Sequence, residues 1–364
     1  MSARLNIAFF GSSLLSSYWN GAATYYRGII RALHARGHRI TFYEPDAFDR
    51  QNHRDIDEPE WARVVVYSGN EDGERRALQQ ARGADVVVKA SGIGANDALL
   101  EREVLSLQSG STAVVFWDVD APATLERLQA DPGDAFRTLV PRYDFVLTYG
   151  GGPRVVAVYR AFGARECVPV YNALDPDTHH PVPPQSHFAA DLSFLGNRLP
   201  DREARVDQFL FEAARRLPEK LFLLGGAGWD HVPANVRAIG HVATADHNAF
   251  NCSARLVLNV NRDSMARFGY SPPTRVFEAA GAGACMIMDE WEGIEHFLEP
   301  GSEVLVARDG ERVAGYVETI GESQARRIGE RARARLLSEH TYARRAELVE
   351  HVLTGRHVRM ERVA

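Results

Sequence analysis

A proline-rich helix start followed by one acid is the part of the sequence best suited to chemistry. It lies in residues 269–289, which read GYSPPTRVFEAAGAGACMIMD. Ser271 can cap a helix here, and Pro272 or Pro273 can occupy its first turn, where a missing N–H costs nothing. A helix that begins in this way leaves backbone amides free to hold an anion such as phosphate.

The residues after the prolines predict what such a helix presents. The amides near Thr274 and Arg275 would face the anion, and Glu278 lies about two turns into the helix. The small residues 279–283 would let the helix pack closely on a strand over 284–288. A capped core helix that ends at a glycine explains the same residues. This segment alone does not distinguish a core helix from an anion-binding one.

Arginines follow two other predicted strands. Arg198 and Arg202 come after a strand and a glycine turn within residues 193–203, and Arg262 follows a strand that ends near Asn259. Guanidinium groups beside a helix start suit a diphosphate, because each can donate two parallel hydrogen bonds. Surface ion pairs with neighbouring acids are the alternative for all three.

Glycine turns recur at predicted strand ends. Gly226, in LLGGAGW, would allow close backbone approach to a ligand, and main-chain groups at His241 and Val242 could meet a base edge. Gly11 and Ser12 follow the first strand and could hold an anion or a sugar. They could equally form a plain turn, since the dinucleotide fingerprint G-x-G-x-x-G is absent.

Two aspartates end an apolar strand over 113–117. Asp118 or Asp120 could accept a proton from an acceptor hydroxyl, although Asp120 could instead cap the next helix. We do not expect the D-x-D pair to bind metal, because the chain does not resemble the single-domain nucleotide fold in which that pair does so. His179 and His180 lack further spaced ligands. We therefore expect no metal and treat these histidines as hinge residues.

Composition limits the class of protein. A length of 364 residues favours two domains, and the net charge of -6 argues against a nucleic-acid partner. The three cysteines are far apart, which is typical of reduced packing residues, and no signal peptide or long apolar run appears, so we expect a cytoplasmic protein. The arginine-rich C-terminal helices could pack on the first domain or meet an anionic membrane. The oligomeric state is not indicated.

Alternating strands and helices predict the architecture. Short apolar runs alternate with helical patterns in both halves of the chain, which indicates two doubly wound α/β domains with parallel sheets. Helices are expected over 22–36, 96–108, 154–162, 202–217, 325–337 and 342–353, and strands over 5–10, 39–43, 85–90, 113–117, 145–148, 192–195, 221–224, 255–260 and 303–306. We predict an N-terminal domain over 1–171, a proline-rich linker over 172–187, a second domain over 188–340 and a C-terminal helix over 341–364. Ligands would bind in the cleft between the strand ends of the two Rossmann-like domains.

Together these features resemble the two-domain GT-B glycosyltransferases, and more narrowly the CgeB-like, spore-maturation-type family. Residues 172–181, NALDPDTHHP, look like the interdomain signature N-G-V-D-x-x-x-F-x-P. Residues 195–202, LGNRLPDR, look like the phosphate-binding stretch G-R-L-x-x-x-K, with Arg202 in place of the lysine. Residues 271–283 are similar to the CgeB-like motif and overlap the E-x7-E motif of glycosyltransferase family four, whose first acid would fall on Tyr270.

The resemblance implies an activity and roles for the residues. The protein would transfer a sugar from a nucleoside diphosphate donor to a hydroxyl of a glycan, a lipid-linked acceptor or a small molecule, without cofactor or metal. Glu278 would hold the ribose hydroxyls, and Arg198 and Arg202 would stabilise the departing diphosphate. The N-terminal domain would hold the acceptor, and the sugar contacts near Tyr270 cannot be carried over from the family. A nucleotide-sugar epimerase and a non-catalytic sugar-binding assembly protein are the alternatives.

Overall fold

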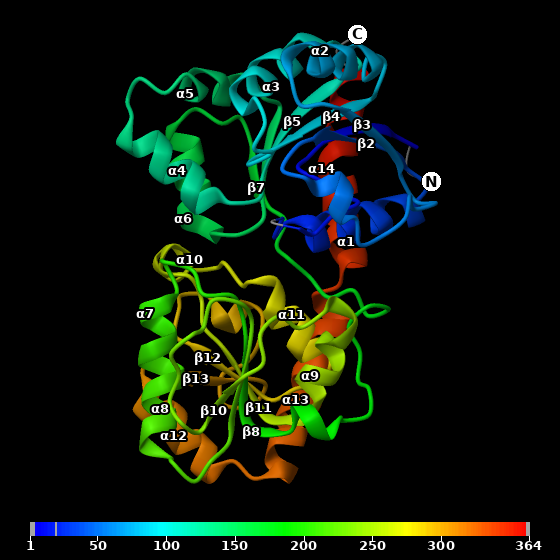
Figure 1. The fold of residues 1–364 in the computed structure, drawn as a ribbon. Coiled ribbons are helices and arrows are strands. Elements are labelled where there is room, and N and C mark those ends of the chain that lie inside the picture. The colour runs from blue at the N-terminus through cyan, green and yellow to red at the C-terminus, as the bar shows by residue number, and fades with distance from the viewer. Residues whose placement is uncertain (1–3, 19, 362–364) are drawn as a thin grey trace. The chain divides into compact units, whose positions relative to one another are not determined.

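The computed structural model describes residues 4–18 and 20–361. The chain forms two compact units, drawn in Figure 1. Unit 1 contains residues 1–171 together with 342–364, and unit 2 contains residues 172–341. Each unit is built on one parallel β-sheet.

The sheet of unit 1 has seven strands in the order β3-β2-β1-β4-β5-β6-β7. Its central strands are apolar and buried on both faces, as expected for a sheet covered by helices on each side. The strands are β1 (Asn6–Phe10), β2 (Arg39–Asp46), β3 (Arg63–Ser68), β4 (Val86–Ala90), β5 (Ala113–Asp118), β6 (Phe145–Thr148) and β7 (Cys167–Pro169).

The helices of unit 1 include the last helix of the chain, α14. This helix packs against α1, and the contact requires Gly28 because a Cβ there would lie 2.2 Å from the ring of Tyr342. The α-helices are α1 (Ala23–Ala35), α2 (Glu71–Gln80), α3 (Asp97–Glu103), α4 (Ala121–Ala130), α5 (Phe136–Leu139), α6 (Gly152–Ala161) and α14 (Tyr342–Glu361), and the 3₁₀ helices are η1 (Arg50–His53), η2 (Val104–Leu107) and η3 (Val140–Arg142).

The sheet of unit 2 has six strands in the order β10-β9-β8-β11-β12-β13. Figure 1 shows it between α7, α8 and α12 on one face and α9, α11 and α13 on the other. The strands are β8 (Ala190–Leu195), β9 (Phe222–Gly225), β10 (Val236–Ala238), β11 (Ala254–Asn259), β12 (Met286–Asp289) and β13 (Leu305–Ala307). The α-helices are α7 (Glu203–Val206), α8 (Glu212–Arg216), α9 (His247–Ser253), α10 (Asp263–Phe268), α11 (Thr274–Gly281), α12 (Gly310–Thr319) and α13 (Glu322–Glu339), joined by a π-helical turn, η5 (Asp207–Phe211), and the 3₁₀ helices η4 (Ser186–Phe188), η6 (Thr244–Asp246) and η7 (Ile294–His296).

The predicted fold class, two doubly wound α/β domains, is confirmed by the two parallel sheets. The predicted elements differ in detail. The helix expected over 202–217 is divided into α7, the π turn η5 and α8. The sequence-based list lacks β3, β7, β10, α2, α4, α5, α9, α10 and α12. Several of these are short or lie at a sheet edge, where few residues carry a periodic signal.

The proline-rich segment 172–187 packs within unit 2. Leu174 and His179 are buried, and the backbone N–H of Leu174 donates to the carbonyl of His340 at 2.8 Å. A Cβ on Gly281, in α11, would lie 2.4 Å from Leu174 and 3.0 Å from the carbonyl of His179. The buried His179 therefore lies against α11, in place of the exposed hinge position that the sequence suggested.

Candidate functional site

The strand order of unit 2 places its switch point between β8 and β11. Chains leave these neighbouring strands in opposite directions, and ligands of open α/β sheets bind at the carboxyl ends of strands at such a point. The loops that begin there are Gly196–Arg202 after β8 and Val260–Arg262 after β11. The helix α11 contributes Arg275 and Glu278 to this region, and α9 contributes its first residue, His247.

Glycines hold the first of these loops against its neighbours. The N–H of Gly196 donates to the carbonyl of Gly225 at 2.8 Å, and its carbonyl accepts from Trp229 Nε1 at 2.8 Å. A Cβ on Gly226 would lie 2.2 Å from the carbonyl oxygen of Gly196. The close approach that the sequence predicted at Gly226 is therefore to this backbone.

Arg202 and Arg275 form an arginine pair without an acidic partner. Within residues 4–18 and 20–361, no side-chain hydrogen bond or ion pair engages either guanidinium group, and Arg202 Nε is buried without a partner. Burial, and next the charge of Arg275, lowers the pKa of Arg202 to about 10. Burial also lowers the pKa of Arg275. Acids act on both groups without a direct ion pair, since Asp201 opposes the shift of Arg202 and Glu278 opposes that of Arg275. Two neighbouring buried cations that no acid pairs directly are an electrostatic site for an anion.

The other two predicted arginines are paired with acids. Arg198 is exposed and lies 2.6 Å from Glu203, and Arg262 Nε lies 2.6 Å from Asp201. The positive charge of each is already balanced by a neighbour, although Arg262 is near enough to Arg202 to lower its pKa. The structure therefore combines Arg202 with Arg275, rather than with Arg198 as the sequence suggested.

The start of α11 differs from the prediction. The helix begins at Thr274, the capping position is Pro273, and the hydroxyl of Ser271 donates to the carbonyl of Gly269 at 2.9 Å. Ser271 as a side-chain cap is therefore wrong. As first-turn residues, Thr274 and Arg275 still have backbone amides that no carbonyl of the helix can satisfy.

Glu278 lies one turn beyond Arg275, on the same face of α11. Among the described residues none donates a hydrogen bond to its carboxylate, and His247 Nδ1 lies 3.9 Å from Oε2. Burial lowers the pKa of His247, while Glu278 opposes the shift. Sequence reasoning missed His247, because a single histidine at a helix start carries no motif.

The loop after β11 is fixed by a buried acid. Asp289, at the end of β12, accepts from the N–H of Asn261 at 3.0 Å and from Arg205 Nη2 at 2.6 Å. Burial raises the pKa of Asp289, and Arg205 opposes this shift. The position of Arg262 thus depends on a contact across neighbouring strands that the sequence did not reveal.

Three further predicted residues of unit 2, His241, Val242 and Tyr270, differ in exposure and backbone conformation. His241 is exposed, and Val242 is buried with Phe250. Tyr270 adopts a left-handed backbone with φ 46°, and its N–H donates to the carbonyl of Glu292 at 2.6 Å. This conformation is costly for a residue other than glycine and persists only where the surroundings enforce it.

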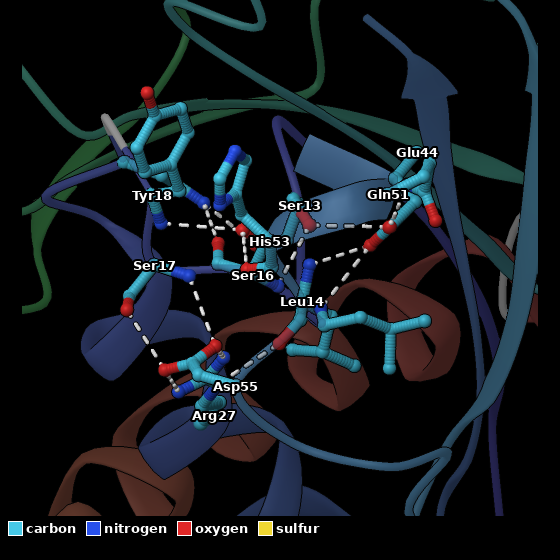
Figure 2. Close-up of polar contacts among 12 residues, drawn as sticks. Ser13, Leu14, Ser16, Ser17, Tyr18, Arg27, Glu44, Gln51, His53 and Asp55 are labelled. Atoms are coloured by element: carbon cyan, nitrogen blue, oxygen red, sulfur yellow. Dashed lines mark hydrogen bonds and ion pairs between the residues drawn. The ribbon is translucent and has the colours of Figure 1, made fainter. Parts of the chain in front are cut away.

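In unit 1 the loop after β1 is held by polar contacts to two carboxylates, the buried Glu44 and the exposed Asp55, which Figure 2 shows. Glu44 accepts from the N–H of Leu14 at 2.6 Å and from Gln51 Nε2 at 2.8 Å. Asp55 accepts from the N–H of Ser17 at 3.1 Å and from Arg27 Nη2 at 2.6 Å. These carboxylates fix the loop that carries the predicted acceptor residues.

Gly11 and Ser12 are themselves enclosed. A Cβ on Gly11 would lie 2.4 Å from the ring of Phe42, so glycine is required there by packing. Ser12 is buried, and its hydroxyl donates to Asn20 Oδ1 at 2.8 Å. Both residues are packing positions of the loop after β1. A ligand would therefore contact the backbone of this loop or its other residues.

The environment of Asp118 argues against its predicted role as a base. The residue is fully buried, and one carboxylate oxygen accepts from Ser91 Oγ at 2.7 Å and Thr124 Oγ1 at 3.0 Å while the other accepts from the hydroxyl of Tyr159. Burial raises the pKa of Asp118. We assign Asp118 a structural role in place of catalysis. Asp120 is partly exposed at the N-cap position of α4, where its side chain makes no capping bond.

Neither a metal site nor a membrane span is found among the described residues. In the part of the chain that the structure describes, no group of three or more His, Cys, Asp or Glu side chains could hold a metal ion. None of the described helices combines the length and apolar character needed to span a membrane.

Comparison with known proteins agrees with the fold. Residues 202–351 match the family profile described as glycosyl transferase-like. No curated protein matches the sequence. Among solved structures, sucrose-phosphate synthase from Thermosynechococcus elongatus is 13% identical with a TM-score of 0.74, over 98% of this chain and 100% of that one.

Two other similar structures contain nucleotides. HepE from Anabaena, in complex with UDP and glucose, is 13% identical with a TM-score of 0.66, over 97% of this chain and 100% of that one. An alpha-glucosyltransferase in complex with UDP and DNA is 12% identical with a TM-score of 0.71, over 97% of this chain and 100% of that one. The protein therefore has the two-domain GT-B fold, and a glycosyl transferase-like region spans residues 202–351.

Proposed function

We propose that this protein is a glycosyltransferase that binds a nucleoside diphosphate sugar through unit 2. The observation that carries the proposal is the arginine pair, Arg202 and Arg275, which forms no direct ion pair with an acid among the described residues. Glu278 acts electrostatically on Arg275, and His247 lies 3.9 Å from Glu278. Structural arginines normally have counter-charges, whereas a site for an anion must leave its cations available.

The arginine pair suits the leaving group of sugar transfer. When an acceptor hydroxyl attacks the anomeric carbon, the bond from that carbon to the diphosphate oxygen breaks, and negative charge develops on the diphosphate. Arg202 and Arg275, with the first amides of α11, would stabilise that charge where it develops. Because these cations supply the positive charge, we propose transfer without a metal ion.

The remaining roles are proposed on the same basis. Glu278 would accept hydrogen bonds from the ribose, as its helix position and resemblance suggest. Asp120, rather than the enclosed Asp118, is the proposed base if the reaction inverts the anomeric centre. We propose uridine as the first base to test, because similar structures are complexes with UDP. The CgeB-like subfamily, a glycan, lipid-linked or small-molecule acceptor and a cytoplasmic location also remain proposals.

Titration calorimetry tests the donor site. Purified protein is titrated with UDP, GDP, ADP and CDP, and then with UDP-glucose, at fixed ionic strength. The variants R202M and R275M should weaken the preferred nucleotide at least tenfold, since a charge-assisted hydrogen bond contributes about 1.5–3 kcal/mol. Arg308 is exposed and paired with Glu290, so R308M is the matched control that should bind normally.

Activity requires a separate measurement. Incubation of the preferred donor with panels of sugar and lipid-linked acceptors should release nucleoside diphosphate and yield a glycosylated product by mass spectrometry. A product in which the sugar is altered but still attached to the nucleotide would indicate an epimerase instead. Failure of all four nucleotides to bind would refute the proposed donor site.

A further inference from the structure

We propose that unit 1 holds a saccharide acceptor by stacking one sugar ring on the exposed ring of Phe48. The inference rests on the proposed function and deepens it, because it names the chemical class of the acceptor. Three observations carry it, namely the position of Phe48, its exposure on a strained backbone, and the polar groups beside it.

Phe48 lies in a segment at the switch point of the sheet in unit 1. Chains leave the neighbouring strands β1 and β4 in opposite directions, and an open α/β sheet binds ligands at the carboxyl ends of such strands. Arg50 Nη1 donates to the carbonyl of Ser12, after β1, at 3.2 Å and to the carbonyl of Ile93, after β4, at 3.4 Å. The segment 48–53 is therefore fixed to both loops of the switch point.

The ring of Phe48 is held in place although it is exposed to solvent. Phe48 is 55% exposed, the highest fraction among the exposed large apolar side chains of the described residues. The guanidinium carbon of Arg50 lies 5.0 Å from the ring centroid, and a Cβ on Gly94 would lie 2.8 Å from a ring carbon. The exposed ring surface is thus a rigid apolar platform, which a ligand can cover at little cost in conformational entropy.

The backbone that presents this ring is strained. Phe48 and Asp49 are both left-handed, with φ 57° and φ 59°. This conformation is uncommon for residues other than glycine and is an outlier for a bulky one. Neither the strain nor the exposed ring stabilises the free protein, and both are typical of a ligand site.

Polar groups beside the ring match the hydroxyl groups of a sugar. Asp49, whose side chain is 59% exposed, accepts from Asn52 Nδ2 at 2.7 Å and from His53 Nε2 at 3.0 Å. The ring of His53 is stacked on that of Tyr18, with centroids 4.0 Å apart, and the two side chains are drawn in Figure 2. An exposed carboxylate that is oriented in this way can accept hydrogen bonds from hydroxyl groups.

A pyranose fits this combination of groups best. One face of the sugar ring carries C–H bonds that pack on the electron-rich face of an aromatic ring, while its hydroxyl groups point outward from the edge. A nucleotide also stacks on aromatic rings, but its phosphates would be repelled by the charge of Asp49. A lipid surface would have to take the same exposed carboxylate out of water, which is costly.

Saturation-transfer NMR with free glycosides tests the inference without a nucleotide. The probes are the methyl α- and β-glycosides of glucose, galactose, mannose and N-acetylglucosamine, with maltose and cellobiose. At least one should bind the wild type, and saturation should be strongest at the C–H protons of one ring face. F48L should weaken that affinity about fivefold and F48W should retain it, because only an aromatic face supplies the stacking.

Stability distinguishes binding from a structural role of Phe48. F48G should lose sugar binding without a lower melting temperature, because glycine adopts the left-handed conformation without strain. Val66 is also exposed in unit 1, on β3, so V66A is the matched control that should leave sugar affinity unchanged. A lower melting temperature of F48G with sugar binding retained would show that Phe48 is structural and would refute the inference.

Calorimetry with nucleotides separates this inference from the proposed function. Whichever of UDP, GDP, ADP and CDP binds the wild type best should bind F48L equally well. If a nucleotide binds but none of the glycosides does, the saccharide site is refuted while the donor site stands. If glycosides bind through Phe48 but no nucleotide binds, the proposed function fails, and the acceptor role fails with it. Binding to phosphatidylglycerol vesicles that F48L abolishes would instead assign the ring to a lipid surface and overturn the inference.

Discussion

We predict that Arg202 lowers the stability of the free protein but strengthens nucleotide binding, so that its replacement has opposite effects on the two. Replacing Arg202 with Met keeps an aliphatic chain of similar length and removes the charge. The pKa of Arg202 is lowered from its ordinary value to about 10, mainly by burial and next by Arg275. At about 1.4 kcal/mol per pKa unit, holding this charge costs the folded protein roughly 3 kcal/mol.

The expected gain in stability is smaller than that cost. Polar hydrogen-bonding groups and the packing of Arg202 near Gly196 are also lost, so we expect R202M to raise the free energy of unfolding by about 1 kcal/mol. Nucleotide affinity should fall at least tenfold in the same variant. The ligand-induced stabilisation should fall with it, since a ligand at 100 times its Kd stabilises the native state by about 2.7 kcal/mol.

Urea unfolding with and without UDP, or another nucleotide that binds the wild type, measures both effects on one sample. R308M should change neither value by more than about 0.5 kcal/mol, because Arg308 is an exposed, paired surface residue. A destabilised R202M that binds nucleotide as well as the wild type would refute the reasoning, because it would show that Arg202 is a structural cation with a favourable environment.

Two further outcomes follow from individual contacts. D118N should lower the free energy of unfolding, measured in urea, by about 1–3 kcal/mol, because an amide cannot accept all the hydrogen bonds of the buried carboxylate. Nucleotide binding should be unchanged. Unchanged stability would restore Asp118 as a candidate base. G28A should lower the melting temperature through a clash with Tyr342, whereas G315A, where a Cβ meets nothing within 4 Å, should not; equal effects would contradict the α1–α14 packing.

Local patterns in the sequence were sufficient for the architecture. Strands such as VVVKA at 86–90 and AVVFWD at 113–118 are apolar except for Lys89 and Asp118, so they indicate a sheet covered on both faces. The helix that carries Glu278 was likewise predicted from its sequence, and its repeat places Arg275 and Glu278, three residues apart, on one face. These properties depend on neighbours in the sequence.

Only the tertiary structure decided which of these residues act together. Arg198 and Arg202 are close in sequence, yet Arg198 forms an ion pair with Glu203. The arginine that lies near Arg202 and likewise lacks an ion pair is Arg275, on a helix far along the chain. Asp118 ends its strand as expected, but Ser91 and Tyr159 from other elements enclose it.

The difference has one physical cause. Hydrophobic period and turn chemistry are set within a few residues, so the sequence by itself determined the two sheets and the helix that presents Glu278. Counter-charges and desolvation are set by the residues that the folded chain packs alongside a side chain. The availability of the arginine pair and the place of His247 beside Glu278 were therefore decided only when strands and helices distant in sequence came together.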